Sequence, residues 1–206
     1  MDELNLELIT LQDGEKLVKK AREAVESFLF NSVKVQGLSG SNFDKNFGVF
    51  VTINSYPDLD LRGCIGFVNP IKRLGEIIVE SAIAAATNDF RFDPIQKEDL
   101  NKIVFEVSIL DRPKLLSCPP EKREQKIKVP RDGLIIEYGG FSGLLLPQVA
   151  AEYKFSPKQF LEALAQKAGL PKNMYLSSSA NIYVFGARIF YEENPKGKIK
   201  EKKLIL

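Results

Sequence analysis

The most chemically promising combination of residues in this sequence is the hexapeptide Leu-Arg-Gly-Cys-Ile-Gly at positions 61–66. Its alternation predicts a strand, on which Arg62 and Cys64 would share one face with Gly66. A guanidinium beside a thiol favours the thiolate and lowers the pKa of the cysteine. The glycines, Gly63 and Gly66, leave the backbone open to close approach by a ligand or another segment. The hexapeptide therefore predicts the floor of a small site.

Cys64 also has a simpler interpretation, because cysteine is among the most frequently buried residues and a cysteine in a strand is usually a small core residue. The chain contains no histidine, so a cysteine nucleophile would take its base from a carboxylate or depend on a lowered pKa alone. Glu106 shares the polar face of a predicted strand with Ser108. It is a candidate base, a hydrogen-bond acceptor, or an ordinary salt-bridge partner of Arg62.

The composition excludes several other kinds of site. Without histidine, the chain cannot form a Ser-His-Asp or Cys-His nucleophile or a histidine-ligated metal centre. Its two cysteines, Cys64 and Cys118, are too far apart in sequence for a thioredoxin-type pair and too few for a thiolate cluster. Asp89 and Asp93 are spaced to share a hard cation, but two ligands are too few, and a loop-bracing pair with Arg91 is preferred. We predict no metal site and assign no cofactor.

The overall composition is that of a soluble globular protein. The 206 residues are 44% hydrophobic and 27% charged, with a formal net charge of +2, which argues against a surface that coats nucleic acid. No apolar run approaches the roughly 18 residues needed to cross a bilayer, and the acidic start lacks the features of a secretory signal. We therefore predict a cytoplasmic protein with no membrane segment and no nucleic-acid partner, ending in a basic, solvated tail at 194–206.

The elements that would position these residues follow from periodicity. Helical spacing predicts helices at 13–31 with Thr10 or Asp13 as the cap, from an Asn69-Pro70 start to about Thr87, and from a Ser156-Pro157 start to a cap at Gly169. Alternation predicts strands, and residues 112–131 form a long connection. Hairpins are expected from the short link before residue 61 and from Gly139-Gly140. The class is α+β, a mostly antiparallel sheet flanked by helices. The predicted strands are 47–54, 61–68, 103–111, 134–138, 141–146 and 181–191.

Six blocks, in order along the chain, resemble the AMMECR domain family, and together they span about residues 10–192. The hexapeptide at 61–66 resembles the family signature, and the alanine-rich segment 81–86 resembles a family helix. Phe90 replaces a common proline. Asp132 stands where many relatives carry histidine, so either Asp132 substitutes for that histidine or, more simply, the histidine is not catalytic. The other matching positions are Asp89, Arg91, Phe92 and Pro94, then 106–110, then Gly143 with 145–149, and then 167–170.

The resemblance implies a single AMMECR-like domain over residues 1–206, with a larger and a smaller lobe and a cleft between them. It implies partners by association, because some relatives occur beside, or fused to, a Memo-type or a radical-SAM protein. It supplies no settled activity and no oligomeric state. It also implies that matching residues meet near the signature strand: Arg62, Cys64, Asp89, Arg91, Glu106, Ser108 and Gln148.

Three hypotheses of function follow. The first is an enzyme in which Cys64 is the nucleophile or acceptor, Arg62 stabilises the thiolate or binds an anionic substrate, and Glu106 moves protons. The second is a non-catalytic binding or adaptor module, in which Gly63 and Gly66 allow close packing. The third, nucleic-acid binding through residues 112–131 and the tail, is the least favoured. We prefer a site that binds a small molecule or a chemical group.

Overall fold

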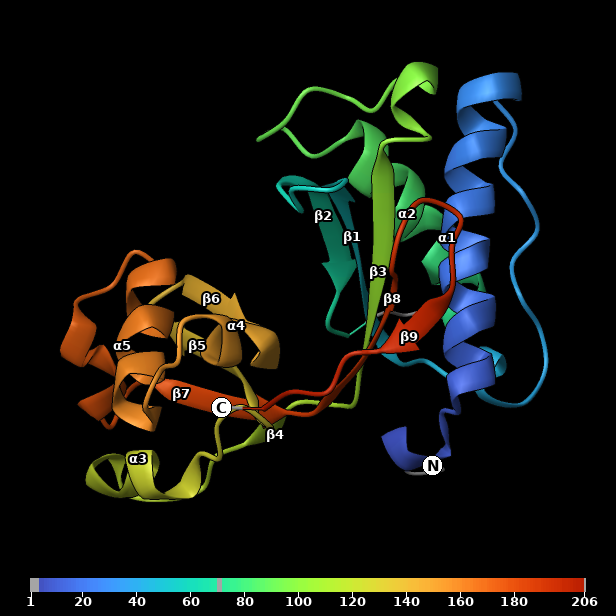
Figure 1. Ribbon diagram of the computed structural model, residues 1–206. Coiled ribbons are helices and arrows are strands. Elements are labelled where there is room, and N and C mark those ends of the chain that lie inside the picture. The colour runs from blue at the N-terminus through green and yellow to red at the C-terminus, as the bar shows by residue number, and fades with distance from the viewer. Residues whose placement is uncertain (1–3, 70–71, 206) are drawn as a thin grey trace. The chain divides into compact units, whose positions relative to one another are not determined.

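The computed structural model describes residues 4–69 and 72–205, and the chain divides into two compact units (Figure 1). Unit 1 contains the chain as far as Asp111 and again from Arg188 to Lys202. Unit 2 contains Arg112–Ala187 and the residues from Lys203. Each unit combines helices with a sheet of antiparallel strands, so the predicted α+β class is confirmed.

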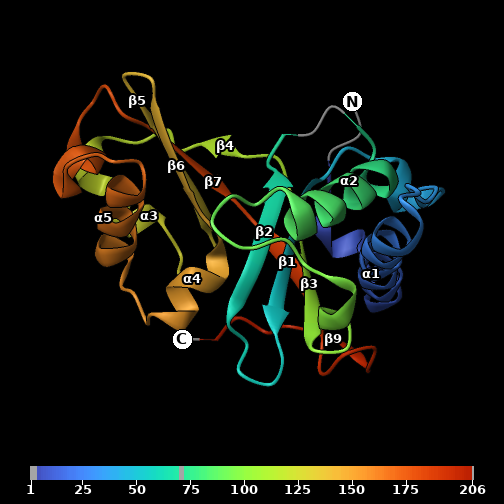
Figure 2. The same ribbon diagram turned by 90° about the horizontal axis from the view of Figure 1, so that it is seen from above.

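Unit 1 is a five-stranded sheet with two long helices on one face (Figures 1 and 2). The strand order is β2-β1-β3-β8-β9. The helices are α1 (Leu11–Asn31) and α2 (Leu74–Thr87). The strands are β1 (Gly48–Ser55), β2 (Leu61–Phe67), β3 (Ile103–Leu110), β8 (Ala187–Glu192) and β9 (Ile199–Glu201).

The helices form where the sequence pattern predicts them. Thr10 caps α1 in a capping box with Asp13, and the buried stripe of α1 includes Leu17 and Val25. In α2 the buried residues are mostly aliphatic and small, and the helix ends at Thr87 as predicted. Its first residue is Leu74 and its N-cap is Arg73, so the helix begins later than predicted and Asn69 does not cap it; Pro70 lies outside the described residues.

Close packing of α2 on the sheet requires glycine in β2. A β-carbon at Gly63 would lie 2.0 Å from the carbonyl oxygen of Ala85, which is backbone and cannot move aside. The small residues of α2 therefore let the helix approach the sheet, and Gly63 completes the contact from the other side.

A buried ion pair ties the end of the chain into unit 1. The Arg22 guanidinium donates to both carboxylate oxygens of Glu192, at 2.7 and 2.5 Å, and to the carbonyl oxygens of Leu100 and Ile103. Glu192 also accepts the Phe105 N–H at 3.1 Å. One pair thus joins α1, β3 and β8.

Unit 2 is built on a four-stranded sheet in the order β4-β7-β5-β6. As predicted, Gly139 and Gly140 make the β5–β6 turn, and both have positive φ angles. Ser156 caps α5, whose buried residues include Phe160 and Leu164. The strands are β4 (Lys114–Leu115), β5 (Gly133–Tyr138), β6 (Phe141–Leu145) and β7 (Asn181–Phe185), and the helices are α3 (Arg123–Lys126), α4 (Pro147–Glu152) and α5 (Pro157–Lys167).

Three sequence predictions need correction. The single strand expected over 181–191 is two strands, β7 and β8, which belong to different sheets and meet at Gly186. The loop expected over 112–131 contains β4 and α3. The tail expected to be solvated contains β9, which pairs with β8 through Ile199 and Glu192.

The contact between Gly63 and Ala85 predicts a measurable stability cost. Gly63→Ala should lower the free energy of unfolding by about 1–3 kcal/mol or more, because the added methyl group meets fixed backbone. Urea unfolding followed by circular dichroism would measure the change. Ser178→Ala, at an exposed serine in unit 2, is the control and should unfold as the wild type does. Equal stability of the two variants would contradict the packing argument.

Candidate functional site

The register of β2, β1 and β3 brings the predicted site residues into rows across the sheet. Cys64 in β2 lies opposite Thr52 in β1, and Thr52 lies opposite Glu106 in β3. Gly66, Phe50 and Ser108 form the next row in the same way. Because neighbouring residues of a strand point to opposite faces, and Gly63 faces α2, these rows lie on the face that points away from α2.

Cys64 is a partly buried thiol with a hydrogen-bond donor beside it. The Thr52 hydroxyl donates to Cys64 Sγ at 3.3 Å. Gly66 has a packing role, since a β-carbon there would lie 2.1 Å from the carbonyl oxygen of Val49. Ser108 is fully buried.

Asp89 holds the backbone of the signature strand. Its carboxylate accepts the Cys64 N–H at 2.8 Å and two side-chain hydrogen bonds from Arg91, at 2.8 and 2.6 Å. The Arg91 guanidinium in turn donates to the Cys64 carbonyl oxygen at 3.2 Å. Asp89 and Arg91 therefore clamp both backbone polar groups of Cys64. The predicted loop-bracing pair of Asp89 and Arg91 is present, and it also holds the backbone of β2.

The contacts between Asp89 and Arg91 shift the pKa values of both side chains. Hydrogen bonds from Arg91 are the main cause that lowers the pKa of Asp89 to about 2, and the Cys64 N–H adds to this effect. The carboxylate is 2% exposed and the Arg91 side chain 41% exposed. The same pairing raises the pKa of Arg91.

The prediction that Arg62 lowers the pKa of Cys64 is wrong. Burial raises the pKa of the thiol above its ordinary value, and the negative charges of Glu106 and Asp89 raise it further. The Thr52 hydroxyl and Arg91 oppose this shift without reversing it. Arg62 Nη2 lies 3.7 Å from Asp99 Oδ2, so its ion pair points to another carboxylate.

The remaining predicted residues are placed as follows. Glu106 Oε2 lies 3.3 Å from Lys202 Nζ, so a residue of the predicted tail, and not Arg62, is the ion-pair partner observed for Glu106. Gln148 is a buried residue of α4 in unit 2, and its predicted place beside Cys64 stays a prediction. Asp132, also in unit 2, accepts the Lys128 N–H at 2.8 Å and is buried.

Thr52 and Lys202 are members of the site that the sequence analysis missed. Thr52 occupies a polar position of the predicted strand 47–54, so pairing that strand in register with 61–68 would have found it. No sequence pattern pointed to Lys202, because its contact with Glu106 depends on the pairing of β9 with β8.

Within residues 4–69 and 72–205, no group of three or more Cys, Asp or Glu side chains is arranged to hold a metal ion. In the same part of the chain, no helix has both the length and the hydropathy to cross a membrane.

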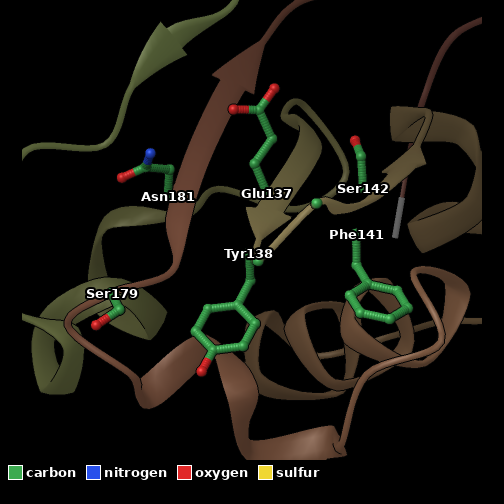
Figure 3. Close-up of a pocket in the computed structure, with 8 residues that line it drawn as sticks. Glu137, Tyr138, Phe141, Ser142, Ser179 and Asn181 are labelled. Atoms are coloured by element: carbon green, nitrogen blue, oxygen red, sulfur yellow. The ribbon is translucent and has the colours of Figure 1, made fainter.

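Each unit has a surface hollow whose lining does not include Cys64. One, of about 360 Å³, lies at the β5–β6 turn of unit 2. Figure 3 shows the rings of Tyr138 and Phe141 on one side of this hairpin and Glu137 and Ser142 on the other. The other hollow, of about 250 Å³, lies in unit 1 beside α1 and α2.

Two antiparallel sheets in two units, with a clamped Arg-Gly-Cys strand at the edge of the larger sheet, make this an α+β protein. The chain belongs to the AMMECR1 family, whose model matches residues 18–190. The predicted family is thereby confirmed.

Relatives share nearly the whole length of the chain. Protein MJ0810 of Methanocaldococcus jannaschii is 45% identical over 201 residues, covering 97% of this chain and 100% of that protein. Protein TV1384 of Thermoplasma volcanium is 45% identical over 194 residues, covering 94% and 96%. The crystal structure of the uncharacterized protein PH0010 from Pyrococcus horikoshii is similar with a TM-score of 0.88 and 45% identity, over 93% of this chain and 97% of that one.

The lowered pKa of Asp89 predicts a pH-dependent contribution to stability. A carboxyl whose pKa falls from 3.8 to about 2 on folding stabilises the folded state by about 2 kcal/mol when it is ionised. This contribution is complete above about pH 5 and disappears as the pH falls through about 2. Urea unfolding of the wild type and Asp89→Asn should therefore differ by about 2 kcal/mol more at pH 6 than at pH 2.

Asp93→Asn, in the same loop and exposed, is the matched control and should follow the wild type at both values of pH. A constant difference between wild type and Asp89→Asn over this range would contradict the role assigned to the Asp89 charge.

Proposed function

We propose that the face of β2, β1 and β3 around Cys64 binds a small molecule or a chemical group, with Cys64 acting as a neutral thiol. The observation that carries the proposal is the row Cys64, Thr52 and Glu106, in which three polar side chains from three adjacent strands share one face. A preorganised row of this kind can recognise a ligand without any cofactor.

The row offers complementary chemistry. Thr52 contributes a hydroxyl, Cys64 a weak donor and acceptor, and Glu106 a carboxylate balanced by the Lys202 ammonium. A ligand that both donates and accepts hydrogen bonds suits this set. The Asp89–Arg91 clamp fixes the Cys64 backbone, so the row keeps its geometry before a ligand arrives.

The electrostatics favour binding over nucleophilic catalysis. A raised thiol pKa leaves little thiolate at neutral pH, and the thiolate is the nucleophilic form. The charge of Arg91 faces Asp89 and the Cys64 carbonyl oxygen, while Arg62 pairs with Asp99. The positive charges near Cys64 therefore have other partners.

The family match spans both units, and on that ground we propose that they serve one function as a single domain in the cytoplasm. Gln148, in a matching block of unit 2, is then proposed as a further binding residue of this domain.

Binding at this row is tested by ligand retention. Wild-type protein incubated with a low-molecular-weight cell extract should retain a compound that is released on denaturation and identified by mass spectrometry. Thr52→Val and Glu106→Gln should each reduce its amount several-fold, because each removes a polar group from the row. Ser178→Ala should retain it fully. Equal retention by all variants would contradict binding at this row.

The ionisation state of Cys64 is tested by alkylation. In a Cys118→Ser background, iodoacetamide at pH 7.5 should label Cys64 several-fold more slowly in the folded protein than in urea, because the raised pKa leaves less thiolate. Glu106→Gln should speed labelling of the folded protein, since it removes a charge that raises the pKa. Labelling of the folded protein that is faster than in urea would restore the nucleophile hypothesis.

A second function, an adaptor that binds a protein partner, is favoured by one observation. Phe90 is 96% exposed, although it is anchored between the clamp residues Asp89 and Arg91. Aromatic residues are enriched among the residues that anchor protein interfaces. A Memo-type or radical-SAM protein that co-purifies with the wild type and with Cys64→Ala, and is lost with Phe90→Ser, would favour this function over ligand binding.

A further inference from the structure

The hollow beside α1 and α2 in unit 1 combines an apolar floor with a charged rim. The two helices lie side by side (Figure 2). The hollow has a volume of about 250 Å³ and is separate from the Cys64 row. Its lining residues are Phe28, Lys34, Glu80, Ile83, Ala84 and Asn88.

At the rim, Glu80 is paired with two lysines: Lys34, which lines the hollow, and Lys72, which is not one of its lining residues. Lys34 Nζ and Lys72 Nζ each lie 2.6 Å from the same oxygen of Glu80, Oε1. Hydrogen bonds from these two lysines lower the pKa of Glu80, so its carboxylate is ionised. Two ammonium groups against one carboxylate leave a net positive charge, and both lysine side chains are about half exposed, at 54% and 45%.

Asn88 adds a neutral donor to the rim. The Thr87 hydroxyl lies 2.6 Å from Asn88 Oδ1 and 2.8 Å from the carbonyl oxygen of Ile83, and its single proton is shared between these two acceptors. The amide N–H groups of the exposed Asn88 side chain can donate to a ligand.

We propose that this hollow binds a small amphipathic carboxylate. Its apolar body would cover Phe28, Ile83 and Ala84, and its carboxylate would accept hydrogen bonds from Lys34 and Asn88. Charge-assisted hydrogen bonds to a carboxylate are among the stronger polar contacts, and the apolar floor contributes by removing surface from water. The net positive charge of Lys34, Lys72 and Glu80 together disfavours a cationic ligand.

The size of the hollow limits the ligand. Sites for drug-sized ligands have volumes of roughly 300–1,000 Å³, so a hollow of about 250 Å³ suits a single aromatic ring or a short branched chain with its carboxylate. An arylacetate has this size and this distribution of charge.

The test uses 4-fluorophenylacetate as the probe and 4-fluorophenylacetamide as its uncharged counterpart, both followed by ¹⁹F NMR titration of the full chain. The acid should bind more tightly than the amide. Lys34→Gln should weaken binding of the acid about tenfold, the effect of losing one charge-assisted hydrogen bond, and should leave the amide unchanged. Ala84→Leu should abolish binding of both by filling the floor.

Lys19→Gln is the matched control, because Lys19 is an exposed lysine of α1 outside the hollow; it should bind both probes as the wild type does. Circular dichroism and thermal unfolding establish that each variant is folded. Equal binding of acid and amide, or equal binding of the acid by the wild type, Lys34→Gln and Ala84→Leu, would overturn the proposal. So would the absence of binding to the wild type.

Discussion

The Arg22–Glu192 pair is the constraint on which unit 1 depends. It joins residues 170 positions apart, and every charged atom of the carboxylate has a donor. A buried charge that loses its partner is strongly destabilising, so α1, β3 and β8 are held as one assembly. The Arg22 guanidinium also donates to the carbonyl oxygens of Leu100 and Ile103, and these hydrogen bonds fix the start of β3. Because β3 carries Glu106 and Ser108, the register of the candidate site rests on an interaction on the opposite, helix-covered side of the sheet.

The charged side chains that hold the signature strand contact the backbone of Cys64 more than its thiol. Asp89 and Arg91 bind the N–H and the carbonyl oxygen of Cys64, and their charges largely cancel one another. The thiol itself lies in a partly buried row with a hydroxyl and a carboxylate. These charges therefore stabilise the shape of the signature strand, while burial is the main reason that the sulfur stays protonated. An arginine two positions from a cysteine in sequence is thus a poor guide to thiol reactivity: the arginine that contacts the Cys64 backbone is 27 positions away.

Structural features that depend on residues close together in the chain were predicted well from the sequence. The caps at Thr10 and Ser156, the hairpin of β1 and β2 and the Gly139-Gly140 turn all follow from residues close in the chain. The α+β class and the Asp89–Arg91 pair were likewise predictable. Features that depend on tertiary partners were not. Residues 181–191 form one run rich in aliphatic and aromatic residues, yet β7 and β8 belong to different sheets. The tail forms β9 only because β8 offers it an edge. Arg62 pairs with Asp99, which no local pattern singles out.

The order of segments in unit 1 has a consequence for how the protein is made. Unit 1 needs β8, which ends at Glu192, and residues 112–187 of unit 2 are translated before that carboxylate is added. The first 111 residues are therefore synthesised long before the Glu192 carboxylate that pairs with Arg22. Until β8 and β9 are made, the sheet of unit 1 is incomplete, and its nascent segment is a natural client for chaperones that shield unpaired strand edges.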